Sequence, residues 1–231
     1  MDATEPKSIL AFGDSLTWGA DPQRDARHPR DGRWPDVLAA ELDEGTNVIA
    51  EGLCGRTTAY DDDTGDCDRN GARLLSTLLA THRPVDLLIV MLGTNDMKPH
   101  VAGTAIAAAQ GMRRLVQIAR SHAAGLTVPH PMQILIVAPP PIVATGNDEA
   151  AAMFAGGVEQ SGQLAGLYSD LAVETGCAFF DAATVAEASP ADGVHLDADN
   201  TAAIGWALAP VVRPLLAAPI DTDQGGLAVA R

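Results

Sequence analysis

The sequence predicts a three-layer α/β/α sandwich built on a central, mostly parallel sheet of about five strands. Short apolar runs alternate along the chain with longer segments whose apolar residues recur near the helical period of 3.6. The apolar runs are continuous, as expected of strands that helices cover on both faces. At 231 residues we expect one domain, with a core of about residues 7–217 and a frayed tail at 218–231.

Five apolar runs are interpreted as strands. They are residues 8–12, 47–50, 86–92, 133–138 and 178–180. Most are short and rich in Val, Ile, Leu and Phe, which suits a buried strand. The pattern predicts the strands but not their order in the sheet.

Helical periodicity covers residues 33–42, 70–82, 104–123 and 158–174. A further helix is expected after Asp197, an aspartate suited to capping its first turn. Pro210 is expected to kink or end this helix, because proline lacks a backbone N–H and clashes with the preceding turn.

Charge and composition narrow the class of protein. A net charge of −15 argues against nucleic acid or an anionic membrane surface as a partner, and no apolar run approaches a membrane span. The N-terminus shows no secretory signal, and the three cysteines fit neither a disulfide framework nor a metal-binding pattern. We therefore expect a cytoplasmic protein with free thiols and no metal.

Four polar clusters follow predicted strands, where ligands bind in an open parallel sheet. They are residues 13–15 (GDS), 52–56 (GLCGR), 93–96 (GTND) and 192–195 (DGVH). Each cluster alone has an ordinary explanation as a cap or turn. Together they supply a nucleophile, a base, an orienting carboxylate and amide donors.

Ser15 is the candidate nucleophile. A serine between a strand and a helix is most often a helix N-cap, so its position alone does not indicate catalysis. A hydroxyl becomes a good nucleophile only when a neighbouring base takes its proton. Histidine is the usual base, because its unperturbed pKa leaves it mostly neutral near pH 7.

Of the six histidines, His195 is the candidate base. The other five, beginning with His28, are expected at the surface. His195 stands three residues after Asp192, whose carboxylate can accept a hydrogen bond from one ring nitrogen and stabilise the imidazolium. Gly55 and Asn95 are candidate donors for an oxyanion, although each could equally be a turn residue.

These residues resemble the GDSL, or SGNH, hydrolase family, which has a flavodoxin-like α/β/α fold. The four marker residues would be Ser15, Gly55, Asn95 and His195, from GDSL, LCGRTT, GTND and DGVH. The blocks FGDSLTWG, EGLCGRTT, DRNGA, LATHRPVDLLIVMLGTND and DGVHL are similar to the branch of bacterial arylesterases and perhydrolase-like acyltransferases.

The resemblance implies a role for each residue. Ser15 would be the nucleophile, His195 the general base and acid, and Asp192 its partner. The oxyanion hole would consist of the Ser15 and Gly55 N–H groups and the Asn95 side chain. The resemblance implies no cofactor and no metal, and it implies a homo-oligomer.

Four further residues are expected in the substrate pocket: Asp14, Trp18, Ala20 and Cys54. Position 20 is alanine where the acyltransferase branch can carry a bulky tryptophan, and residues 21–32 are highly charged. Both features would change the shape or polarity of the pocket.

The leading hypothesis is a serine esterase that hydrolyses small aryl or alkyl esters through an acyl-enzyme, with acyl transfer or perhydrolysis as further reactions. One alternative is a deacetylase of acetylated sugars or other polar metabolites, which the charged residues 21–32 favour. Another is a non-catalytic, flavodoxin-like domain that binds an anion at residues 13–15.

Overall fold

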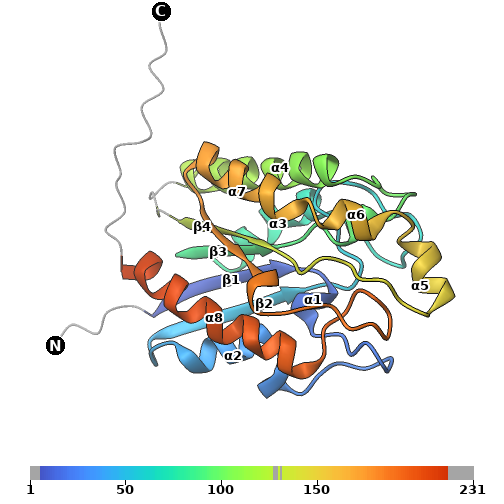
Figure 1. Cartoon of the computed structure of the whole chain (residues 1–231). Coiled ribbons are helices and arrows are strands. Elements are labelled where there is room, and N and C mark those ends of the chain that lie inside the picture. The colour runs from blue at the N-terminus through green and yellow to red at the C-terminus, as the bar shows by residue number, and fades with distance from the viewer. Residues whose placement is uncertain (1–5, 127–129, 131, 218–231) are drawn as a thin grey trace, which may run out of the picture.

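Five parallel strands form one sheet in the order β2-β1-β3-β4-β5 (Figure 1). The computed structural model describes residues 6–126, 130 and 132–217, so the predicted tail at 218–231 lies outside the described residues. The strands are β1 (Lys7–Gly13), β2 (Thr46–Gly52), β3 (Leu87–Met91), β4 (Gln133–Ala138) and β5 (Ala178–Asp181). The prediction of a parallel sheet of about five strands is confirmed.

Helices cover both faces of the sheet (Figure 1). One face carries α2 (Trp34–Glu41) and α8 (Ala198–Ala217), and the other carries α3 (Gly71–Thr81), α4 (Ala105–Ala124) and α7 (Leu164–Thr175). The shorter elements are α1 (Ser15–Trp18), α5 (Asp148–Met153), α6 (Gly157–Ser161) and the 3₁₀ turns Arg30–Gly32, Asn95–Met97 and Ala182–Thr184. The predicted three layers are therefore present.

Alternate side chains of the central strands enter two separate cores. In β1, Leu10 and Phe12 pack beneath α3, α4 and α7, whereas Ile9 and Ala11 pack beneath α2 and α8. All four side chains are fully buried, which explains why the run is continuously apolar. The edge strands β2 and β5 are only partly buried.

The segment predicted as one helix at 158–174 is two helices. The first, α6, ends at Ser161 and α7 begins at Leu164. The buried Ser161 hydroxyl accepts a 2.8 Å hydrogen bond from the Ile142 N–H, and Gly162 follows it. The apolar period continues across this break, so periodicity alone could not reveal it.

The last helix, α8, does not end at Pro210 but continues to Ala217. Pro210 and Pro214 are exposed, whereas Leu208 and Val212 are buried in the core beside α2. The backbone hydrogen bond that Pro210 cannot make therefore lies toward solvent, and burial of the opposite face stabilises the helix. Of the two effects expected of Pro210, ending the helix is wrong for that reason, and a kink stays a prediction.

The strand order places a crevice at the end of β1. From β1 the chain passes to β2 on one side of it, whereas β3 pairs with the other side. Ligands bind at such a switch point, beyond the carboxyl ends of the strands. Among the helices of the described residues, none combines the length and apolarity that crossing a bilayer requires.

Gly205 sets the contact between α8 and α2. A Cβ atom there would lie 2.7 Å from both the Trp34 carbonyl oxygen and the Val37 Cβ. We expect Gly205→Ala to lower the free energy of unfolding by about 1–3 kcal/mol through overpacking. Gly166→Ala is the matched control, because Gly166 lies in α7 with no atom within 4 Å of the new methyl group.

The control should raise the free energy of unfolding by about 0.5–1 kcal/mol, since alanine favours the helix over glycine. Urea unfolding followed by circular dichroism measures both changes. Equal effects of the two substitutions would contradict the close α2–α8 contact.

Candidate active site

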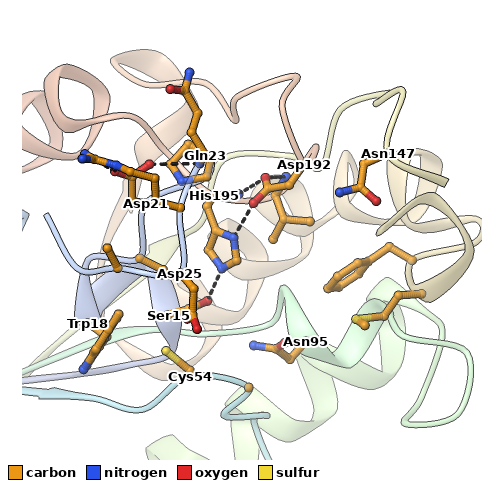
Figure 2. Close-up of a pocket in the computed structure, with 18 of the residues that line it drawn as sticks. Ser15, Trp18, Asp21, Gln23, Asp25, Cys54, Asn95, Asn147, Asp192 and His195 are labelled. Carbon is orange, nitrogen blue, oxygen red and sulfur yellow. Dashed lines mark hydrogen bonds and ion pairs between the residues drawn. The ribbon is translucent and has the colours of Figure 1, made fainter. Parts of the chain in front are cut away.

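Three polar side chains from two distant parts of the chain form one hydrogen-bonded row at the carboxyl edge of the sheet (Figure 2). Ser15 is the first residue of α1, directly after β1, and its Oγ lies 2.9 Å from His195 Nε2. His195 Nδ1 lies 2.6 Å from Asp192 Oδ2. Residues predicted to act together, 180 positions apart in sequence, are thus in contact.

Asp192 holds the histidine in place. Its Oδ1 accepts hydrogen bonds of 2.9 Å from the N–H groups of Val194 and His195, while Oδ2 accepts from the ring. Burial alone would raise the pKa of Asp192, but these hydrogen bonds outweigh it and hold the pKa below its usual range. An ionised carboxylate only accepts, so Nδ1 carries the proton and Nε2 can accept the proton of Ser15.

Asp14, and not Ser15, caps α1. The Asp14 Oδ1 accepts a 2.9 Å hydrogen bond from the Leu16 N–H. The alternative interpretation of Ser15 as the N-cap is therefore wrong, and its hydroxyl faces His195 instead.

The predicted oxyanion donors border the same space. In the described part of the chain, the N–H groups of Ser15 and Gly55 donate to no protein acceptor. Gly55 adopts a φ of +82°, a conformation that favours glycine. Asn95 begins the 3₁₀ turn after β3, and its side chain points toward Ser15 from the other side (Figure 2).

The Asn95 amide is held by two long hydrogen bonds. Its Nδ2 donates to Asp14 Oδ2 at 3.3 Å and to the Arg56 carbonyl oxygen at 3.2 Å. Both distances exceed the usual 2.9–3.0 Å, so a stronger acceptor in the pocket could attract one of these N–H groups at low cost.

Two carboxyl groups are fully buried beneath the site. Burial raises the pKa of Asp14 to about 6 and that of Asp96 to about 7, against the opposing effect of hydrogen bonds from Leu16 and Thr58. The Thr58 N–H and hydroxyl both donate to Asp96. The negative charge of Asp14 raises the pKa of Asp96 further.

A cavity of about 630 Å³ opens in front of Ser15. Trp18, Ala20 and Cys54 line it, together with Ser15, Gly55, Asn95, Asp192 and His195. Asp14 differs from the prediction: it does not line the cavity but lies buried beneath Ser15.

Comparison with known protein families identifies the family of this chain. A model of the GDSL-like lipase/acylhydrolase family matches residues 11–204. The chain belongs to this family. As a member it is a serine esterase, a carboxylic ester hydrolase.

Among solved structures, the chain is similar to a carbohydrate acetylesterase family member from Sinorhizobium meliloti, with 56% identity, a TM-score of 0.89 and coverage of 92% of this chain and 100% of the other. It is also similar to the aryl esterase of M. smegmatis, with 41% identity, a TM-score of 0.85 and coverage of 90% and 99%. A search of curated proteins gave no match.

Residues 21–26 of this GDSL-like hydrolase line the cavity, as the charged segment 21–32 was expected to affect the pocket. The cavity also has lining residues that the sequence did not indicate: Arg69, Lys98, Asn147, Met153, Phe154 and Val194. Those from 147–154 follow β4, so the strand-end rule could have pointed to them. Arg69 lies in DCDRNG, which has no such signal.

His28 is buried rather than exposed, contrary to the expectation. Its Nε2 forms a 2.8 Å hydrogen bond with the Leu196 carbonyl oxygen, next to His195. The charged residues around His28 favour a surface position, but this histidine is buried and connects the segment 21–32 to the loop of the candidate base.

No cluster of three or more His, Cys, Asp or Glu side chains among residues 6–126, 130 and 132–217 is arranged to hold a metal ion. Around Ser15, the side chains of His195, Asp192 and Asn95 form hydrogen bonds within the protein.

The raised pKa of Asp96 predicts a specific dependence of stability on pH. The folded protein holds the Asp96 proton up to about pH 7, whereas the unfolded chain releases it near pH 3.8. Stability is therefore lost as the pH rises from about 4 to about 7. The stability of wild type relative to Asp96→Asn should fall by about 2–3 kcal/mol between pH 5 and pH 8, at about 1.4 kcal/mol per pH unit.

Urea unfolding of both proteins at the two pH values measures this difference. Asp63→Asn, a substitution of an exposed carboxyl, is the control and should show no such change. A pH-independent difference between wild type and Asp96→Asn would mean that Asp96 is ionised throughout this range.

Proposed function

We propose that Ser15 is the nucleophile, His195 the general base and acid, and Asp192 its orienting partner in the hydrolysis of small, short-acyl carboxylic esters. The observation that carries the proposal is the Ser15 Oγ–His195 Nε2–Asp192 row, with distances of 2.9 and 2.6 Å. A serine with such a base has the arrangement that acyl transfer requires.

The reaction proceeds in two halves. Ser15 Oγ attacks the ester carbonyl while its proton passes to His195 Nε2, and the imidazolium then gives that proton to the departing alcohol. Water attacks the resulting acyl-enzyme, with His195 as base, and releases the acid and free Ser15. The ionised Asp192 stabilises the imidazolium in both halves.

The oxyanion of each tetrahedral intermediate would be bound by the N–H groups of Ser15 and Gly55 and by Asn95 Nδ2. The two backbone groups have no protein acceptor among the described residues, and the Asn95 hydrogen bonds are long. Donors already in place stabilise the developing charge without reorganisation.

Labelling with a fluorophosphonate tests the nucleophile. Wild type should take one label, at Ser15, and Ser15→Ala should lose the label and at least about 10³-fold in kcat. Ser76→Ala, an exposed serine in α3, is the matched control and should behave as wild type. Ester hydrolysis by Ser15→Ala at the wild-type rate would show that Ser15 is not the nucleophile.

Aryl esters are the leading substrates in this proposal, because Trp18, Met153 and Phe154 provide apolar walls to the cavity. The solved structure named as an aryl esterase supports this choice. Acetylated sugars are a second candidate. Asp21, Gln23 and Asp25 give the same cavity a polar wall, and the neighbour at 56% identity is named a carbohydrate acetylesterase family member.

A substrate panel separates the two candidates. On the sugar hypothesis, Gln23→Ala and Asp25→Ala should each lower kcat/KM for acetylated sugars about 5–10-fold and leave p-nitrophenyl acetate within about twofold, since each removes one hydrogen bond to a hydroxyl. Asp31→Ala is the control, because Asp31 lies in the same charged segment but outside the cavity lining. Uniform kcat/KM for sugar acetates across all variants would leave aryl esters as the better assignment.

Acyl transfer, a homo-oligomeric state and a cytoplasmic location belong to the same proposal. Acyl transfer to an alcohol or peroxide would use the apolar wall at Met153 and Phe154 to compete against water. Met153, which lines the cavity, and Val158 are exposed apolar side chains, and they support a homo-oligomer. Three unpaired cysteines support a reducing, cytoplasmic location.

A further inference from the structure

The Arg69 side chain lies against the turn that carries Gly55. A Cβ atom on Gly55 would lie 2.9 Å from both Cδ and Nε of Arg69, and one on Gly65 would lie 2.5 Å from Arg69 Nε and Cζ. The guanidinium therefore occupies the space that side chains at both glycines would need. It also lines the cavity in front of Ser15.

A buried carboxylate fixes the outer end of Arg69. The Asp62 side chain is fully buried, and its Oδ2 lies 3.7 Å from Arg69 Nη1 and 3.3 Å from Lys98 Nζ. Burial alone would raise the pKa of Asp62, but hydrogen bonds from Thr64 and the Lys98 charge hold it well below its usual range. His100 Nε2 lies 3.4 Å from Asp62 Oδ1.

The backbone of Arg69 is attached to the same turn. The Thr57 N–H, two residues after Gly55, donates to the Arg69 carbonyl oxygen at 3.0 Å. Asn70 follows, and its side chain caps α3 by accepting from the Ala72 N–H at 3.0 Å. Both ends of Arg69 are thus restrained, and the middle of its side chain contacts Gly55.

We propose that Arg69 is a positioning residue of the oxyanion hole, which holds the Gly55 turn so that its N–H faces the cavity. The inference rests on the proposed function, because it needs Gly55 to be an oxyanion donor. A glycine turn has no side chain of its own to anchor it, and a φ of +82° is one of several conformations open to glycine. Packing of the guanidinium on the Gly55 backbone restricts that freedom before the substrate arrives.

Arg69 is a poorer candidate for an anion-binding residue. Its Nε is buried and has no hydrogen-bond partner in the described part of the chain, and the side chain is only 21% exposed. Asp62 compensates part of its charge, and Asp21 and Asp25 line the same cavity. Packing against Gly55 is therefore the better-supported role of the Arg69 side chain.

The test compares Arg69→Ala and Arg69→Lys with wild type in two assays. One is the hydrolysis of p-nitrophenyl acetate, resolved into kcat and KM. The other is inhibition by an alkyl trifluoromethyl ketone, whose carbonyl carbon bonds to Ser15 Oγ and leaves an oxyanion in the hole. Arg73→Ala is the matched control, because Arg73 is half exposed, outside the cavity and paired with Asp61 and Asp68 at 2.7 Å.

Arg69→Ala should lower kcat about 10–100-fold with KM within about twofold, and should raise Ki for the ketone by the same factor as kcat falls. Arg69→Lys, which can still pair with Asp62 but lacks the planar group, should be intermediate. Arg73→Ala should match wild type. A partly unfolded sample would lose kcat and keep the Ki of its folded fraction, so the joint change reports positioning and not stability.

If Arg69→Ala loses cooperative unfolding, Arg69→Met, which fills more of the space between the glycines, takes its place in the same comparison. An active wild type together with unchanged kcat and Ki in Arg69→Ala overturns this inference and leaves the proposed function standing. So does a fall in kcat without a rise in Ki. A wild type that neither hydrolyses the ester nor reacts with a fluorophosphonate overturns both.

Discussion

The buried carboxylate of Asp14 joins the two strand ends on which the site is built. One oxygen accepts from the Leu16 N–H and fixes the start of α1, where Ser15 lies, and the other accepts from Asn95 after β3. The two strands arrive in register, because Gly13 at the end of β1 pairs with Met91 at the end of β3. Burial raises the pKa of this carboxyl to about 6, because removing the group from water disfavours its ionised form. The position of Ser15 therefore depends on the buried Asp14 carboxyl. Burial of this group is unfavourable by itself, and the hydrogen bonds from Leu16 and Asn95 offset that cost.

Most of the fold could be predicted because each central strand is buried on both faces, which leaves a continuous apolar run in the sequence. The errors occur where tertiary contacts override the local pattern. Pro210 remains within α8 because the buried face of that helix includes Leu208 and Val212. The break after Ser161 depends on a hydrogen bond to the distant Ile142, which no local pattern records. Strand order also depends on tertiary contacts. It is decided by how the connecting helices pack on the sheet and not by the sequence of any one strand.

The site likewise has residues that the sequence predicts and residues that only tertiary contacts reveal. The strand-end rule needs only the strand positions, and it points to Ser15, which directly follows β1, and to the loop between β5 and α8 that carries His195. Asp14 is expected in the pocket, but it does not line the cavity and its side chain caps α1 instead. Arg69 could not be predicted, since its contact with Gly55 depends on how the segment around Asp62 packs over the turn. A residue that acts by packing on the backbone of another segment produces no characteristic motif or spacing in the sequence.

The buried His28 makes the polar wall of the cavity and the loop of the candidate base parts of one unit. Its N–H donates to the Gly19 carbonyl oxygen at 2.8 Å, and its ring hydrogen-bonds with the Leu196 carbonyl oxygen. The segment around Gln23 and Asp25 projects from this anchor into the cavity. If this wall contacts the substrate as proposed, substitutions at Gln23 or Asp25 would change that contact without moving His195, whereas a substitution at His28 would disturb both segments. Under the proposed function, substrate range and catalytic geometry would therefore be separable, because His28 is buried whereas Gln23 and Asp25 are exposed.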